Sequence, residues 1–350
     1  MSAMLEVTDL ATTFRTVRGL VRAVDGVTFE IDAGRTLAIV GESGSGKSVL
    51  ARSLMNLLPA SADTSRGTAV FKGTQLRGQS AAALRRIWGN EISMIFQDPM
   101  TSLNPVVKVG RQITESLRFH RGRRGAAAQD RALELMRDVG IPDPASRLGV
   151  YPHQLSGGMR QRVAIATALA CEPSLLIADE PTTALDVTIQ RQILDLLQRL
   201  QAELGMAIIL ITHDLGVAAG RTDEVAVMYA GRIVEKAATP VLFSAMRHPY
   251  TEALLASIPR LDNPVHTRLT TIGGRPPDLI NPRRGCAFAP RCRYAQPRCL
   301  EEDPVLETAT TAGHEVACFY PVDTEAGRAA LSANSAAGVS AAGATVGAAV

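Results

Sequence analysis

The sequence has little net charge, few lysines and no long apolar run. Its 350 residues carry 37 basic and 34 acidic side chains, a formal net charge of +3, which falls short of the strongly basic signature of nucleic-acid binding. The longest apolar runs, such as Val163–Cys171 and Met206–Ile211, are well below the roughly 18 residues that indicate a membrane span. Glu6 and Asp9 precede any long apolar block, so no secretory signal is expected. A hydrophobic fraction of 46% is nevertheless enough for a sizeable core and argues against a disordered chain.

Continuous apolar stretches predict buried strands of a parallel sheet. They are Thr36–Val40, Ser174–Ala178, Ala207–Ile211 and Glu224–Tyr229. Apolar residues that recur on one helical face separate them, over residues 132–139 and 193–200, and this alternation predicts an α/β core. Between about residues 98 and 170 the patterns are helical, which predicts an inserted helical subdomain. The alternative is that these helices simply flank the sheet.

The composition changes after Ile258. Five prolines between residues 259 and 285 indicate a linker rather than a continued sheet. Four cysteines follow within residues 286–320, and the chain carries no charged residue after Arg328. We therefore expect a core domain over residues 1–258, a Pro-rich linker, a short Cys-rich C-terminal module over 286–320, and a low-complexity tail over 321–350 that is disordered rather than helical.

A glycine-rich segment between a predicted strand and a predicted helix has the pattern of a phosphate-binding loop. Its residues are Gly41, Ser43, Gly44, Ser45, Gly46, Lys47 and Ser48. The glycines let backbone N–H groups point at phosphate oxygens, and the helix N-terminus adds the positive end of its dipole. Lys47 is expected to reach the β- and γ-phosphates, and Ser48 to ligate Mg²⁺. The alternative is a structural glycine turn.

Two carboxylates end the strand that is expected around residue 177. Asp179 suits an outer ligand of the metal, whereas Glu180 would face the γ-phosphate and orient or deprotonate the attacking water. Ser156 is predicted to cap a helix that runs through Val163–Ala170, and Gly157 and Gly158 expose backbone N–H groups beside it. An ordinary capped helix without a ligand is the alternative for this last segment.

Three further motifs complete a set that resembles an ATP-binding cassette ATPase. Gln97 lies in Phe-Gln-Asp-Pro, Asp186 ends Ala-Leu-Asp after the acidic pair, and His213 lies in Ile-Thr-His-Asp. The resemblance covers roughly residues 5–235, with the motifs in the usual order. It implies an ABC-type P-loop ATPase core that binds ATP and Mg²⁺.

The amino-acid sequences of three segments resemble those of one branch of this family, the ATP-binding subunits of oligopeptide, dipeptide and nickel importers. These segments are Leu155–Gln161, Pro181–Gln190 and His248-Pro-Tyr-Thr-Glu-Ala-Leu-Leu. The resemblance implies import of di- or oligopeptides across the cytoplasmic membrane. It implies a second ATPase subunit, two permease subunits and an extracytoplasmic solute-binding protein as partners, and a peripheral place at the cytoplasmic face of the membrane. Nickel or another small solute is an alternative cargo, and a soluble ATPase that acts on nucleic acid or ribosomes is a remote one, since no basic arm is present.

The resemblance also implies roles for individual residues. Gln97 would contact Mg²⁺ or the attacking water, and His213 would hold the γ-phosphate. Asp186 would lie at the dimer interface, where Ser156, Gly157 and Gly158 act on the nucleotide of the opposite subunit. Phe14 would stack on adenine, although the family more often has tyrosine there and the link to the sheet is longer here.

Cys286, Cys292, Cys299 and Cys318 lie within 33 residues. Stable disulfides are not expected in a cytosolic ATPase, so ligation of a soft metal is the default. Spacings of five and six residues fit zinc poorly, whereas a cubane cluster has no need for close pairs. The segment also resembles the C-terminal part of peptide importers, some of which hold a [4Fe–4S] cluster. Zinc, with His314 in place of Cys318, and free thiols are the alternatives, and Cys171 is expected to be a core residue.

Overall fold

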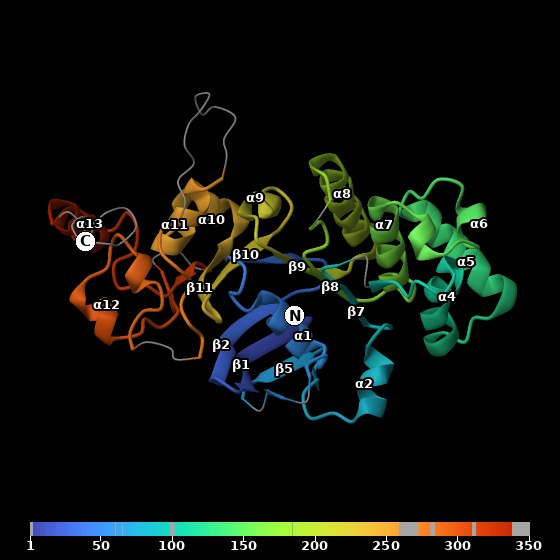
Figure 1. The fold of residues 1–350 in the computed structure, drawn as a ribbon, viewed down its shortest axis with the longest axis horizontal. Coiled ribbons are helices and arrows are strands. Elements are labelled where there is room, and N and C mark those ends of the chain that lie inside the picture. Colours follow the sequence, from blue (N-terminus) through green and yellow to red (C-terminus); the bar gives the residue numbers. More distant parts are fainter. Residues whose placement is uncertain are drawn as a thin grey trace. The chain divides into compact units, whose positions relative to one another are not determined.

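The computed structural model describes residues 3–337 except for positions 60, 65, 99–101, 184, 259–271, 281–283 and 310–312. Its elements divide into two compact units (Figure 1). The first unit comprises Met1–Glu6, Glu30–Thr36 and Ala69–Ile211, and the second comprises Val7–Phe29, Leu37–Thr68 and Thr212–Val350. Because the chain passes between them repeatedly, neither unit is one continuous segment.

The first unit is built on a parallel sheet of three neighbouring strands, β7 (Ile92–Ile95), β8 (Leu175–Asp179) and β9 (Ala207–Thr212). β8 lies in the middle, because Leu175 pairs with Ile92 on one side and with Ala207 on the other. Every residue of β8 and β9 is buried, which confirms the interpretation of their continuous apolar runs. β7 was not predicted; at four residues it is too short to stand out from its surroundings.

The remaining elements of the first unit are mostly helices. They are β5 (Thr68–Phe71), β6 (Thr74–Gln75), α2 (Ala81–Ile87), α4 (Val109–His120), α5 (Gly125–Asp138), α6 (Pro144–Arg147), η1 (Pro152–Gln154), α7 (Gly157–Ala168) and α8 (Val187–Leu204). α4, α5 and α7 pack against one another, and α7 also packs against β7 (Figure 1). The helices therefore belong to the same unit as the three strands, and a separate inserted subdomain is not confirmed.

The second unit contains a mixed sheet. Its strands follow the order β12 (Glu307–Thr308), β13 (Glu315–Val316), β11 (Arg232–Ala238), β10 (Glu224–Tyr229) and β3 (Thr36–Val40). β3 and β10 are parallel, as predicted, whereas β11, β13 and β12 continue the sheet in antiparallel pairs. The two-residue strands β12 and β13 come from the predicted Cys-rich module, and such short strands have no periodicity that a sequence could reveal.

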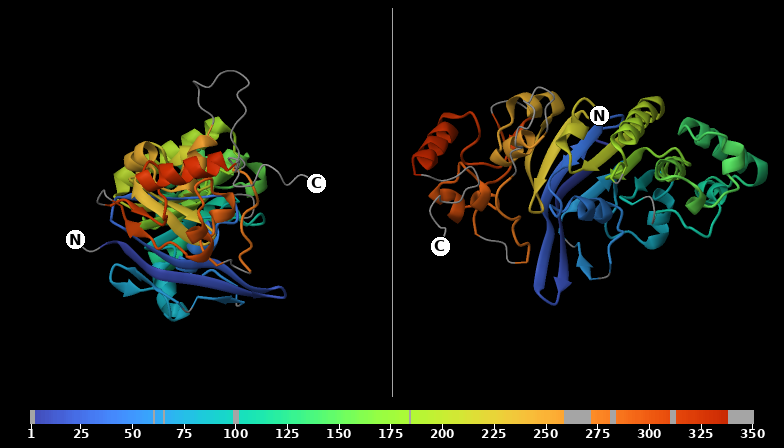
Figure 2. Two further views of the ribbon diagram at one scale, coloured as in Figure 1. Left: turned by 90° about the vertical axis from the view of Figure 1, so that its left-hand side faces the viewer. Right: turned by 45° about the horizontal axis from the view of Figure 1, so that its top comes forward.

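The unit also holds a hairpin and a set of short helices. β1 (Leu5–Thr16) and β2 (Gly19–Ile31) are neighbouring strands that form the long hairpin seen in both views of Figure 2. The hairpin was missed, although buried residues alternate with more exposed ones from Val27 to Ile31, which is a strand signal. The other elements are α1 (Lys47–Leu54), β4 (Ala62–Asp63), α9 (Leu215–Ala218), α10 (Thr239–Ala245), α11 (Pro249–Ala256), η2 (Ala289–Arg291), α12 (Pro297–Glu301) and α13 (Glu325–Ala336).

The segment from Cys286 to Cys318, called the cysteine segment below, shares an apolar core with the sheet of the second unit. Phe288, Cys292 and Tyr294 are buried in one apolar cluster with residues of β3, β10 and α11. A separate Cys-rich C-terminal module is therefore not confirmed. The disordered tail is wrong for residues 325–336, which form α13 with Thr324 as its N-cap; residues 338–350 and most of the predicted linker lie outside the described residues.

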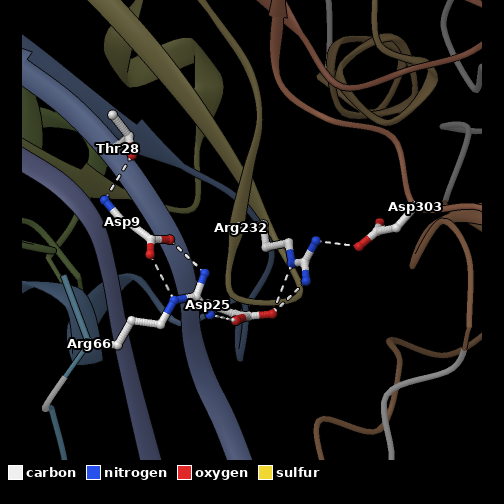
Figure 3. Close-up of polar contacts among 6 residues, drawn as sticks. All are labelled: Asp9, Asp25, Thr28, Arg66, Arg232 and Asp303. Carbon is white, nitrogen blue, oxygen red and sulfur yellow. Dashed lines mark hydrogen bonds and ion pairs between the residues drawn. The ribbon is translucent and has the colours of Figure 1, made fainter.

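A chain of ion pairs joins the hairpin, β11 and the cysteine segment (Figure 3). Arg66 donates to Asp9 at 2.5 Å and to Asp25 at 3.0 Å, and Asp25 also accepts from Arg232 at 2.6 Å. Arg232 in turn pairs with Asp303, near the end of α12. Asp25 is the most enclosed of these side chains, at 12% exposed, so it is the central link of the chain.

Candidate nucleotide site

The predicted phosphate loop, residues 41–48, lies between β3 and α1 in the second unit. A Cβ atom on Gly41 would lie 2.1 Å from the carbonyl oxygen of Met228, and one on Gly46 would lie 2.1 Å from that of Ala23. Gly46 also has a φ of +104°, which favours glycine. Neighbouring backbone therefore leaves no space for a side chain at these two positions, and only glycine fits there.

Lys47 closes the loop from inside. Its side chain is buried, and its ammonium donates to the carbonyl oxygens of Gly41 and Glu42 at 2.7 and 2.9 Å and to Ser45 Oγ at 3.3 Å. The charge of a buried lysine is thus directed into the concave side of the loop, where a phosphate group would compete for it. Ser43 and Gly44 are exposed at the tip, and Ser48 lies in the first turn of α1.

The two predicted carboxylates lie at the carboxyl end of β8 in the first unit. Asp179 is fully buried and Glu180 is 9% exposed. One oxygen of Glu180, Oε2, accepts from Gln97 Nε2 at 3.1 Å and from Thr183 Oγ1 at 2.7 Å. Glu180 has a φ of +48°, a conformation that is rare outside glycine and occurs at sites where a side chain must be aimed. The structure therefore brings Gln97 and Glu180 together, and it adds Thr183, which the sequence did not single out.

Two helix N-termini of the first unit carry the residues expected to act on a second subunit. Ser156 caps α7 by accepting from the N–H of Met159, and Asp186 caps α8 by accepting from that of Ile189. The helices approach each other, because a Cβ on Gly158 would lie 3.0 Å from Ile189 Cγ2. Ser156 and Asp186 are both exposed, so each is available to a partner.

The other two predicted residues lie in the second unit. Phe14 is half-buried in β1, opposite Ala62 of β4, and His213 is an exposed residue directly after β9. The phosphate loop, Phe14 and His213 thus share one unit, whereas Asp179, Glu180, Gln97, Ser156, Gly157, Gly158 and Asp186 share the other.

The four cysteines line a single small pocket in the second unit. Cys286, Cys292, Cys299 and Cys318 share it with aromatic residues that include Phe288 and Phe319. All are thiols. Burial raises the pKa of Cys286 to about 11 and that of Cys318 to about 12, so these thiols stay protonated near neutral pH unless a cation is present. Among the described residues, no three His, Cys, Asp or Glu side chains are arranged to hold a metal ion.

His314 does not belong to this pocket. Its Nε2 lies 2.8 Å from Glu235 Oε1, and both residues are almost fully buried. Glu235 also accepts from the backbone N–H groups of Arg247 and His248. His314 therefore pairs with Glu235 of β11 just before β13, and its contacts give no support to the alternative in which it replaces Cys318 in a zinc site.

Two regions of the chain match known families. Residues 24–183 match the ABC transporter family, and residues 234–299 match the C-terminal region of oligopeptide and dipeptide transporters. Over 307 residues the chain is 54% identical to the oligopeptide transport ATP-binding protein OppD of Bacillus subtilis (strain 168), which covers 87% of this chain and 86% of that protein. The chain belongs to the ATP-binding proteins of ABC peptide transporters.

A second relative and a solved structure are also similar to this chain. The dipeptide transport ATP-binding protein DppD of Lactococcus lactis subsp. cremoris is 52% identical over 86% of both chains. A dimeric ATP-binding cassette in a post-hydrolysis state with ADP and Pi superimposes with a TM-score of 0.61 at 28% identity, over 67% of this chain and 99% of that one. The match confirms the cassette fold. The names of these two ATP-binding proteins favour peptides over nickel as the cargo.

No helix among the described residues has the length and apolarity needed to cross a membrane.

Proposed function

We propose that this chain binds and hydrolyses ATP to drive the import of di- or oligopeptides. The observation that carries the proposal is the loop between β3 and α1, where backbone leaves no room for a Cβ on Gly41 or Gly46. A loop of this kind presents N–H groups and a helix N-terminus to a phosphate chain. The buried Lys47 supplies the charge that such a ligand needs.

The donor set for Mg²⁺ consists of oxygen atoms, which this ion prefers. Ser48 and Gln97 would contribute a hydroxyl and an amide oxygen, and Asp179 a carboxylate at the end of a fully buried strand. When bound, the ion neutralises charge on the phosphate oxygens during transfer. The role of the three residues would be to hold the ion in place.

Glu180 would act as the general base. Its Oε2 accepts hydrogen bonds from Gln97 and Thr183, which orients the carboxylate that would accept a proton from the attacking water. His213 would hold the γ-phosphate and Phe14 would stack on adenine. Ser156, Gly157, Gly158 and Asp186 would complete the nucleotide site of a second subunit, which explains why both helix caps are exposed.

The partners are those that the resemblance to peptide importers implies. A second ATPase subunit would supply the missing half of each site, and two permease subunits would carry the peptide, with a solute-binding protein outside the membrane. The chain would sit at the cytoplasmic face as a peripheral subunit. The helices α4, α5 and α7, which pack against one another, would form the surface that contacts the permease.

A [4Fe–4S] cluster on Cys286, Cys292, Cys299 and Cys318 is part of the proposal. The support is that four thiols, the ligand type that such a cluster takes, line one apolar pocket; they are not arranged around a metal ion in this structure, so binding would draw them together. A cluster would cross-link a segment that has only short helices and strands. Iron content of anaerobically purified protein, with zinc measured in the same sample, tests this part separately.

Turnover tests the proposed reaction. Glu180→Gln is expected to retain ATP binding and to lower kcat by about 100-fold or more, because the phosphate loop is intact and the base is lost. Lys47→Ala is expected to weaken ATP binding itself. Glu203→Gln, an exposed change near the end of α8, is the matched control, and all three would be measured in the complex purified from membranes. Unchanged turnover in Glu180→Gln would refute the role of Glu180.

A further inference from the structure

A residue of the phosphate loop is held by two residues from far along the chain. The backbone N–H of Glu42 donates to Tyr250 Oη at 2.8 Å. Its carboxylate accepts two hydrogen bonds from Arg291, Nη1 to Oε2 at 2.6 Å and Nη2 to Oε1 at 2.9 Å. Such a bidentate pair fixes both position and orientation. Glu42 lies between Gly41 and Ser43, so the contact acts on the loop that we propose as the phosphate site.

Arg291 is itself fixed in place. Its side chain is only 3% exposed. Its Nε donates to the carbonyl oxygen of Gly273 at 2.8 Å, and further hydrogen bonds reach Tyr229 Oη and the carbonyl oxygen of Ile272, both at 3.3 Å. A guanidinium with this many partners has little freedom to follow the loop. The loop must therefore adapt to Arg291.

The support behind the pair is rigid as well. Tyr229, Tyr250 and Phe288 form an aromatic cluster with ring centroids 4.6 to 5.3 Å apart. Tyr229 ends β10, Tyr250 lies in α11, and Phe288 belongs to the cysteine segment. The guanidinium carbon of Arg291 lies 5.8 Å from the ring of Tyr229 and 6.0 Å from that of Phe288, within reach of a cation–π interaction.

Through Arg291, the cysteine segment thus contacts the phosphate loop directly. Arg291 closes the short helix η2 and directly precedes Cys292, one of the four pocket thiols. We infer that Arg291 is a positioning residue for the phosphate loop, through which the folding of the cysteine segment sets the affinity for ATP. The inference rests on the proposed function, because it requires that this loop binds the nucleotide.

The experiment compares Arg291 with its neighbour Arg293. Arg293 lies in the same segment, but its guanidinium pairs with Glu252 of α11. The dissociation constant for Mg·ATP, kcat and the thermal midpoint are measured for wild type, Arg291→Gln, Arg291→Lys and Arg293→Gln in the purified complex. We expect Arg291→Gln to raise the dissociation constant about 10-fold, Arg291→Lys to restore part of the affinity, and Arg293→Gln to stay within about 2-fold of wild type.

A double-mutant cycle separates positioning from general stability. Glu42→Gln and the double variant Glu42→Gln/Arg291→Gln are expected to bind ATP as weakly as Arg291→Gln alone, since all three lose the same ion pair. The inference is overturned if Arg291→Gln lowers the thermal midpoint but binds ATP as tightly as Arg293→Gln. If wild type itself does not bind ATP, the proposed function fails and the inference falls with it.

Discussion

The phosphate loop and the cysteine segment reach their shapes in different ways. The loop is shaped by backbone packed closely against it, because two of its glycines lie where the carbonyl oxygens of Met228 and Ala23 exclude a side chain. The segment from Cys286 to Cys318 has only short elements, and aromatic packing and ion pairs tie it to the rest of its unit. The difference predicts that changes in the loop act on nucleotide alone, whereas changes in the segment act first on its own order and then on the loop.

The largest effect is expected at Gly46. Alanine there would meet the carbonyl oxygen of Ala23 in a φ of +104°, so Gly46→Ala is expected to weaken ATP binding by about 100-fold or more. Gly44→Ala is the matched control, since Gly44 also has a positive φ but no atom within 4 Å of an added Cβ, and it should cost much less. Equilibrium dialysis with labelled ATP measures both. If Gly46→Ala also lowered the iron content of the protein, a change in the loop would affect the cysteine segment, and the expectation that loop changes act on nucleotide alone would be wrong.

Cys292 tests the opposite direction. Cys292→Ser removes a ligand of the proposed cluster, so iron content is expected to fall to a small fraction of the wild-type value. ATP affinity should drop only several-fold, because Arg291 remains but loses a fixed neighbour. Cys171→Ala, in a buried position outside the pocket, is the control and should keep its iron. Equal iron in the two variants would remove the cluster from the proposal.

Gly285 sharpens the comparison within the segment. It has a φ of +82°, and an added Cβ would lie 2.5 Å from the carbonyl oxygen of Cys299, which accepts from the N–H of Cys286 at 2.8 Å. Gly285→Ala is expected to lower the free energy of unfolding by about 2 kcal/mol. Gly313→Ala has a similar φ but open space around the Cβ, so about 1 kcal/mol is expected. Similar values for the two would mean that the contact with Cys299 is unimportant.

The smallest effect is expected in the ion-pair chain of Figure 3. Burial opposes ionisation of Asp25, but hydrogen bonding to Arg232 and the charges of Arg232 and Arg66 outweigh it and lower the pKa of Asp25 below its model-compound value of 3.8. A carboxyl with a depressed pKa in the folded state contributes stability above its unfolded pKa and loses it as pH falls through the folded pKa. Asp25→Asn should therefore cost about 1 kcal/mol at pH 7 and almost nothing once the pH is below the lowered pKa of the folded state.

Urea unfolding of wild type and Asp25→Asn at pH 7 and near pH 2.5 measures this difference. Asp195→Asn, an exposed change in α8 whose pair with Arg191 spans 3.7 Å, serves as the control and should change stability by less than about 0.5 kcal/mol. A constant cost of Asp25→Asn at both pH values would show that the carboxylate charge is not what stabilises this junction.

Local patterns predicted much of the fold. The strand predictions at residues 36–40 and 224–229 match β3 and β10, and the apolar face from Ile193 to Leu200 is the buried face of α8. The hairpin of β1 and β2 was not predicted, although buried and exposed residues alternate at the end of β2. The helix α13 was not predicted either, because its alanine, glycine and serine content is also typical of disordered tails. The motifs indicated Glu180 and Gln97, but not Thr183, whose hydrogen bond to Glu180 depends on the turn after β8.

What the sequence determined by itself is the family and the glycine and lysine pattern of the predicted phosphate loop, since that pattern is a property of neighbouring residues. Only the tertiary structure decided that His314 pairs with Glu235 rather than with the cysteines, and that Arg291 holds Glu42 across 249 positions of the chain. Contacts between distant segments depend on how a core closes, and no local spacing records which buried carboxylate meets which buried cation.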